Sequence, residues 1–118
     1  MFVNRRISPF VAGLLVAACG SNSNSTAPTT PVSAATVTAA SSIRFTPATV
    51  DLVAGGTVTF QFQSVQHDVF FDNDPAGAPS NIATPTANAA VARTFNTPGR
   101  YQYNCHIHPG MSGVIVVH

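Results

Sequence analysis

From about residue 33 onward, the chain consists of short runs in which hydrophobic and polar residues alternate. The clearest run is TVTFQFQ (residues 57–63), with Val58, Phe60 and Phe62 on one face and polar side chains on the other. Successive side chains of a β-strand point to opposite faces, so this run predicts a strand with one buried face. We find no segment with the periodicity of an amphipathic helix.

Pro, Gly and Asn residues separate several further short runs that are typical of β-strands. The segment from residue 72 to residue 90 holds too many of these breakers for a long element, so we expect a loop with a short strand or turn inside it. Short strands at regular spacing indicate an all-β fold, a small antiparallel β-sandwich or barrel. The predicted strands are ATVDLV before a turn at Gly55-Gly56, TVTFQFQ, HDVFF, AVARTF, YQYNC and GVIVV.

Aromatic residues supply the candidate core of this domain. Tyr101 follows a Pro-Gly turn by two residues and resembles the tyrosine of a Greek-key corner, which favours a structural role over a redox role. The core candidates are Phe45, Phe60, Phe62, Phe70 and Phe95.

The first eighteen residues predict a targeting signal. Arg5 and Arg6 precede an apolar run at residues 10–18 that is too short to span a bilayer. The sequence VAAC at its end resembles the lipobox of bacterial lipoproteins, in which Cys19 would carry lipid; the alternative is an ordinary secretory signal. Residues 19–32 then predict a flexible tether and residues 33–118 the folded domain. We therefore expect an exported lipoprotein on the periplasmic or cell-surface side.

Charged residues are scarce along the whole chain. It has five arginines and four aspartates, with neither lysine nor glutamate. This composition supports neither a nucleic-acid footprint nor a polybasic membrane patch. Membrane attachment is expected only through Cys19.

Metal-donor side chains crowd into CHIHPGM, residues 105–111. Cys105, His108 and Met111 follow the pattern C-x2-H-x2-M, and His67 stands at the start of its own predicted strand. Two imidazoles, a thiolate and a weak thioether are the donors of a trigonal copper site with a long axial Met, whereas zinc takes four firm ligands. If Cys19 carries lipid, Cys105 is left alone in an oxidising compartment, where a bound metal would protect it.

The motifs HDVFFD, FNTPGRYQYNC and CHIHPGMSGVIVV resemble, in this order, those of the cupredoxins, the family of plastocyanin, amicyanin and pseudoazurin. The resemblance covers about residues 43–117, and the ligand loop has the short amicyanin-like spacing. It implies a Greek-key β-sandwich with one type 1 copper ion. The equatorial ligands would be His67, Cys105 and His108, with Met111 axial.

His106 is the remaining donor in this loop. Asn104 precedes the cysteine and no His-x-His pair occurs upstream, which excludes the trinuclear cluster of multicopper oxidases. In the family, the residue after the first histidine ligand commonly bonds to the residue after the cysteine. Asp68 and His106 occupy these positions, and we hypothesise a charge-assisted side-chain pair. The alternative is a solvated histidine, which is also our expectation for His118.

The resemblance implies one-electron transfer by copper cycling between Cu(I) and Cu(II). Electrons would pass through the exposed edge of His108 to transient redox partner proteins, and we expect a monomer. The sequence contains no nucleophile–base arrangement or carboxylate pair, so we do not expect an enzyme. The alternatives are a copper storage or delivery lipoprotein without electron transfer, and a structural or adhesive surface lipoprotein on the same scaffold.

Overall fold

The computed structural model describes residues 30–72 and 76–118, which form eight strands and no helix. The predicted signal peptide, Cys19 and the tether up to residue 29 lie outside the described residues. Within the described part of the chain, no helix has the length and hydrophobicity needed to cross a membrane. The strands are β1 (Val32–Ala40), β2 (Arg44–Thr46), β3 (Thr49–Phe62), β4 (His67–Phe71), β5 (Ile82–Thr86), β6 (Ala89–Phe95), β7 (Gly99–Asn104) and β8 (Ser112–Val117).

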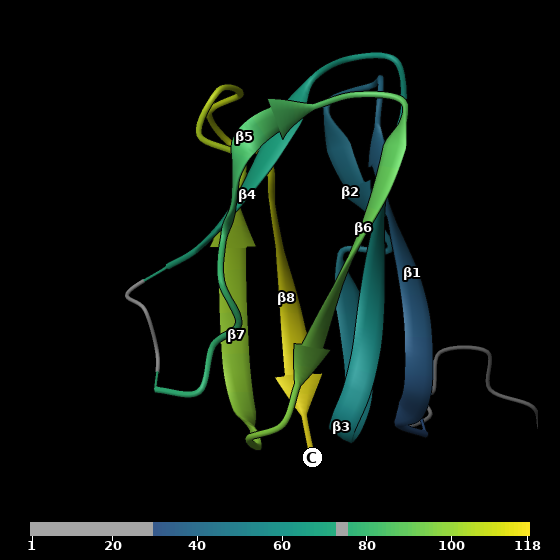
Figure 1. The fold of residues 1–118 in the computed structure, drawn as a ribbon, viewed down its shortest axis with the longest axis vertical. Helices are drawn as coiled ribbons and strands as arrows, with labels where there is room; N and C mark the ends of the chain where they lie inside the picture. The colour runs from purple at the N-terminus through teal and green to yellow at the C-terminus, as the bar shows by residue number, and fades with distance from the viewer. Residues whose placement is uncertain (1–29, 73–75) are drawn as a thin grey trace, which may run out of the picture.

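The strands form the predicted β-sandwich, in which β4, β7 and β8 face β1, β3 and β6 (Figure 1). The hydrogen-bonded order is β2-β1-β3-β8-β7-β4-β5, and β6 pairs with β3. The expectation of purely antiparallel pairing is wrong, because β3 runs parallel to both β1 and β8. Parallel neighbours require crossover connections, and alternation along one strand carries no information about which strand lies beside it.

The Gly55-Gly56 pair does not form the predicted turn. β3 continues through it, and residues 49–52 pair with β8 whereas residues 56–62 pair with β6. Gly55 has a φ of 89°, and a Cβ on Gly56 would lie 2.7 Å from the side chain of Leu52. The two glycines therefore allow one long strand to change partners between the layers.

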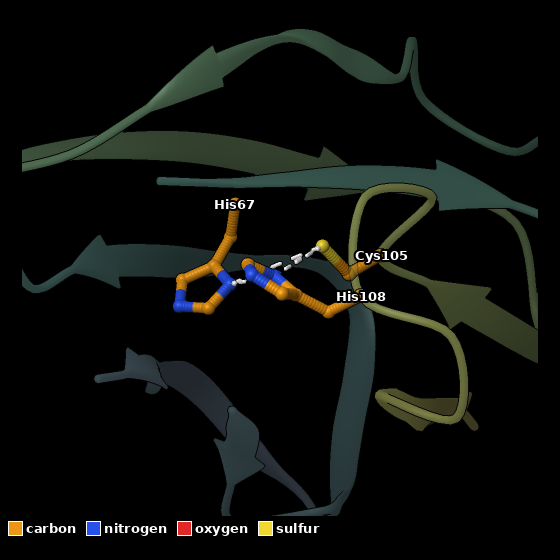
Figure 2. A group of neighbouring side chains, drawn as sticks. All are labelled: His67, Cys105 and His108. Carbon is orange, nitrogen blue, oxygen red and sulfur yellow. Dashed lines mark hydrogen bonds between the residues drawn. The ribbon is translucent and has the colours of Figure 1, made fainter. Parts of the chain in front are cut away.

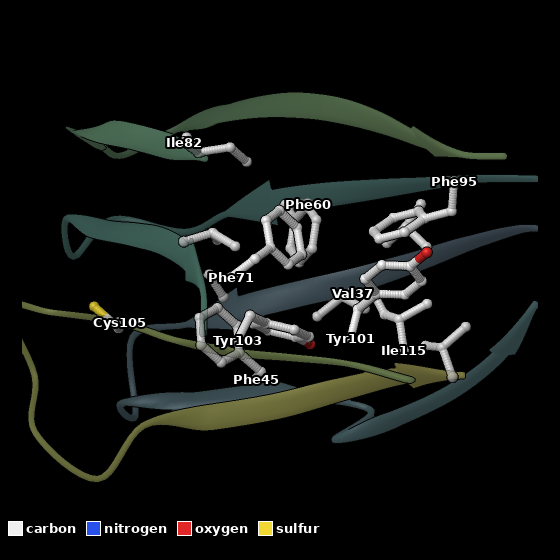
Figure 3. Packing of buried hydrophobic residues seen from close by; sticks show 14 of the residues in the cluster. Val37, Phe45, Phe60, Phe71, Ile82, Phe95, Tyr101, Tyr103, Cys105 and Ile115 are labelled. Carbon is white, nitrogen blue, oxygen red and sulfur yellow. The ribbon is translucent and has the colours of Figure 1, made fainter. Parts of the chain in front are cut away.

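Aromatic side chains fill the space between the layers, as predicted (Figure 3). Four of the five candidate phenylalanines are buried, and the hydroxyl of Tyr101 donates to the carbonyl oxygen of Thr97 at 2.6 Å, which confirms its structural role. Phe70 is the exception and is only half-buried. It lies on the outer face of β4, because adjacent residues of a strand point to opposite sides and its neighbours Val69 and Phe71 face the core.

The loop at residues 105–111 lies at the end of the sandwich opposite the C terminus (Figure 1). It connects the last residue of β7 to the first residue of β8, and these two strands pair from Gly99↔Val117 to Asn104↔Ser112. β4 pairs with the end of β7 through Phe70↔Asn104 and Phe71↔Tyr103. This pairing brings the start of β4 close to the loop.

Candidate metal centre

Three of the four predicted ligands converge at the end of the sandwich that holds the loop of residues 105–111 (Figure 2). His67 is the first residue of β4, Cys105 follows β7 directly, and His108 lies in the loop. The Nδ1 atoms of the two histidines are 3.1 Å apart. The Sγ atom of Cys105 lies 3.9 Å from Nδ1 of His67 and 3.5 Å from Nδ1 of His108.

These distances fit one metal ion at the centre of the triangle. Bonds of about 2.0–2.3 Å to a common ion, about 120° apart, place N and S donors about 3.5–3.7 Å from one another. The three observed separations of 3.1, 3.5 and 3.9 Å lie around this range. Two imidazoles and a thiolate in a trigonal arrangement are the donor set of blue-copper sites.

His67 is oriented by a hydrogen bond on the other side of its ring. Its Nε2 lies 2.9 Å from the carbonyl oxygen of Ala40, at the end of β1. A carbonyl only accepts, so Nε2 carries the proton and Nδ1 presents its lone pair to the site. Burial of the fully enclosed ring lowers the pKa of His67 below its usual 6.5, which keeps the imidazole neutral and ready to bind a metal.

The loop is also closed by its own backbone. The amide of Cys105 donates to the carbonyl of Met111 at 2.9 Å, and the amide of Met111 donates to the carbonyl of His108 at 3.1 Å. Gly110, with a φ of 90°, allows the tight turn between them. Met111 is buried where the loop enters β8, and Cys105 is buried at the edge of the core.

Asp68 and His106 are connected, but not as we hypothesised. The Oδ1 atom of the buried Asp68 accepts the backbone amide of His106 at 2.6 Å. The imidazole of His106 stacks instead on Phe70, with ring centroids 3.9 Å apart and planes at 6°. The hypothesis of a side-chain pair is therefore wrong. The amide that follows the cysteine has left the strand pairing and takes the carboxylate as its acceptor.

The side chain of His118 is half exposed, and its Nε2 lies 2.9 Å from Oδ1 of Asp51.

Two contributors to the site were not found from the sequence. Asn104 donates through Nδ2 to the carboxylate of Asp72 at 2.5 Å, which ties the end of β7 to the end of β4. The signal in the sequence that could have identified Asn104 was its position as a polar residue directly before the cysteine. Ala40 acts through its backbone carbonyl, which every residue possesses, so no side-chain pattern could have identified it.

Residues 32–118 match the family model described as copper binding proteins, plastocyanin/azurin family. The chain therefore belongs to this family, as its motifs predicted, and its cofactor is a single copper ion.

Two curated proteins are similar in sequence. Amicyanin-alpha of Methylorubrum extorquens is 33% identical over 78 residues, which are 64% of this chain and 65% of that protein. The chloroplastic plastocyanin of Physcomitrium patens is 35% identical over 83 residues, which are 62% of this chain and 49% of that protein. The chain thus spans between half and two thirds of the length of these relatives.

Solved structures of the same kind superpose on this fold. A reduced tryptophan-to-tyrosine mutant of amicyanin has a TM-score of 0.61 and 27% identity, covering 73% of this chain and 83% of that one. The copper-containing nitrite reductase of Thermus scotoductus SA-01 has a TM-score of 0.58 and 27% identity, covering 78% of this chain. Only 23% of the reductase is covered, so the similarity extends to one part of that larger enzyme.

Proposed function

We propose that this protein transfers single electrons through a type 1 copper ion held by His67, Cys105 and His108, with Met111 as the axial ligand. The observation that carries this proposal is the convergence of two Nδ1 atoms and one Sγ atom within 4.8 Å of one another. Their chemistry is that of a blue-copper site, and Met111 is buried at the foot of the same loop.

Bound copper would supply the one-electron couple between Cu(I) and Cu(II). The protein's part is to hold the donors still while the charge of the ion changes. His67 is held through Ala40, and the loop is held by its two backbone hydrogen bonds and by Asp68. Such a preformed arrangement keeps the structural change on electron transfer small, which favours rapid exchange.

His108 is the proposed route for electrons. It is half-buried, whereas His67 and Cys105 are enclosed, so its ring lies nearest to solvent among the three donors. Ile107 beside it is 42% exposed, and Pro109 is also exposed. We infer that redox partners dock transiently here and that the protein is not itself an enzyme.

The proposed setting is outside the cytoplasm. The lipobox-like VAAC sequence at residues 16–19 supports an exported lipoprotein, held through Cys19 on the periplasmic or cell-surface side of a membrane. We also propose that the protein is a monomer. The scarcity of positive charge supports the absence of nucleic-acid binding.

Copper titration of the purified domain tests this function. We expect added Cu(II) to produce an intense thiolate-to-copper absorption band in the visible range, a type 1 EPR spectrum and a reversible redox couple. Cys105→Ser should abolish the band, because the thiolate is its origin. His106→Gln is the matched control and should retain it, since this ring stacks on Phe70 rather than facing the donors.

A colourless site that binds only Cu(I) would overturn electron transfer and support copper storage or delivery instead. Loss of the band in the His106→Gln variant would show that the ligand assignment is wrong.

A further inference from the structure

Two adjoining hollows lie on the surface beside the ligand loop. The first has a cavity volume of about 590 Å³ and is lined by residues that include Arg44, Ala48, Met111 and Ser112. The second has a volume of about 230 Å³ and is lined by residues that include Arg100, Ala48 and Ser112. Because they share Ala48 and Ser112, the hollows form one groove, which we call the Arg44–Arg100 groove.

This groove runs from the copper end of the molecule along β8. Gly110 and Met111 line its first end, directly beyond His108 in the loop. Its middle is formed where the β2–β3 connection lies against β8, with the amide of Val114 donating to the carbonyl of Ala48 at 2.9 Å. Its far end reaches Arg100, which pairs with Val116 across β7 and β8. A partner bound in the groove would therefore lie next to the metal centre.

This groove is lined by the two arginines that have no hydrogen-bond or ion-pair partner in the described part of the chain. Arg93, the third arginine among residues 30–72 and 76–118, donates to the carbonyls of Ser80, Asn81 and Ala92. Arg44 and Arg100 are exposed, and neither forms a hydrogen bond or ion pair within these residues.

The negative charges of the described chain lie elsewhere and are engaged. Asp51 contacts His118, Asp68 accepts the amide of His106, and Asp72 accepts the side chain of Asn104. None of these carboxylates lines either hollow. The groove thus has two guanidinium groups at its ends and no acidic residue in its lining to neutralise them.

We propose that the Arg44–Arg100 groove docks a carboxylate-rich segment of the redox partner protein. Guanidinium groups bind carboxylates through paired hydrogen bonds. Arg44 lines the same hollow as Ser112, and Arg100 pairs with Val116, four residues further along β8. This spacing is about 13 Å along the strand, so an extended segment with two or more carboxylates could engage both arginines at once. Two charges are too few to hold the phosphate backbone of a nucleic acid firmly at physiological salt. This inference rests on the proposed function.

An NMR titration tests the docking surface. The probe is a hexa-aspartate peptide, added at low ionic strength to the ¹⁵N-labelled Cu(I)-loaded protein. We expect the backbone amides of Ala48, Gly110, Ser112 and Val114 to shift. Each of Arg44→Gln and Arg100→Gln should weaken binding about two- to fivefold, the range of exposed ion pairs, and added salt should weaken it further. Arg44→Lys is the charge-preserving comparison. It keeps the ion pair but loses the paired hydrogen bonds, so it should bind more weakly than the wild type and more tightly than Arg44→Gln.

Shifts that cluster on another surface, or that persist unchanged in the Arg44→Gln/Arg100→Gln double variant, would overturn the proposal. The readout involves no electron transfer, so a failed docking result leaves the redox test of the copper site intact. Conversely, a site that stores copper without cycling it would still allow the groove to be tested on the Cu(I) protein.

Discussion

Tyr103 is a core residue whose ring and hydroxyl have opposite effects on the stability of the fold. Its fully buried ring packs edge-on against Phe45, Phe60 and Phe71, at centroid distances of 4.8, 5.4 and 6.1 Å. Its hydroxyl has no protein hydrogen-bond partner among the described residues. Burial raises the pKa of this phenol above its ordinary value, so the group stays neutral. The ring contributes packing, whereas the hydroxyl contributes only a desolvation penalty.

Replacing Tyr103 with phenylalanine should therefore stabilise the protein. We expect the free energy of unfolding of the copper-free protein, measured by urea denaturation, to rise by about 1–2 kcal/mol, because an unsatisfied buried polar group is removed while the ring remains. Tyr101→Phe is the matched comparison. It should destabilise by about 1 kcal/mol, because it deletes a hydrogen bond to Thr97 that is 2.6 Å long. Equal losses in both variants would contradict this account.

Among the secondary-structure elements, the turn between β1 and β2 has the clearest link to the metal centre. The carbonyl of Ala40 accepts both the amide of Ile43 at 3.0 Å and the Nε2–H of His67 at 2.9 Å. Ser41 anchors the turn to the end of β3, with its amide donating to Oε1 of Gln63 at 2.8 Å. Ile43 has a φ of 65°, which is unfavourable for a β-branched side chain. The turn that orients His67 thus contains local backbone strain.

Glycine at position 43 should relieve this strain. We expect Ile43→Gly to be more stable than Ile43→Ala by about 1 kcal/mol in thermal or urea unfolding, because both variants remove the side chain and only glycine tolerates a positive φ without cost. Comparing the two variants cancels the loss of the partly exposed isoleucine side chain. Equal stabilities would mean that the turn relaxes once the isoleucine is removed.

For the whole molecule, burial of His67 makes the stability of the copper-free protein depend on pH. The pKa of His67 is lowered by burial in the folded state, whereas the unfolded chain titrates near 6.5. Below pH 6.5 the unfolded state therefore binds more protons than the folded state, and stability falls as the pH is lowered towards the folded pKa. Above this range both states are neutral at His67 and the effect disappears.

Urea unfolding between about pH 8 and about pH 5 measures this dependence. We expect the copper-free protein to lose stability across the acidic half of the range, and His67→Asn to reduce the slope. Copper should oppose the loss, because the metal binds only the deprotonated Nδ1 and stabilises the folded state. A wild-type slope in the His67→Asn variant would assign the dependence to other groups.

The fold class and the donor residues could be predicted because each depends on local pattern. Alternation in TVTFQFQ and the β-branched residues of GVIVV identify strands that the structure contains as parts of β3 and β8. The spacing of Cys105 and His108 places two donors on one loop, and the structure brings His67 to them. The coordination by Met111 stays a prediction.

The remaining features depend on contacts between residues that are distant in the chain. The strand continuing through Gly55-Gly56, the parallel pairing of β3 and the outward position of Phe70 all depend on which strands become neighbours. The same holds for the carboxylate of Asp68, which bonds to a backbone amide rather than to the predicted imidazole. Side-chain chemistry and periodicity are determined by the sequence alone. Backbone acceptors such as the carbonyl of Ala40 are common to every residue, so only the packed fold selects which of them orients the candidate ligand His67.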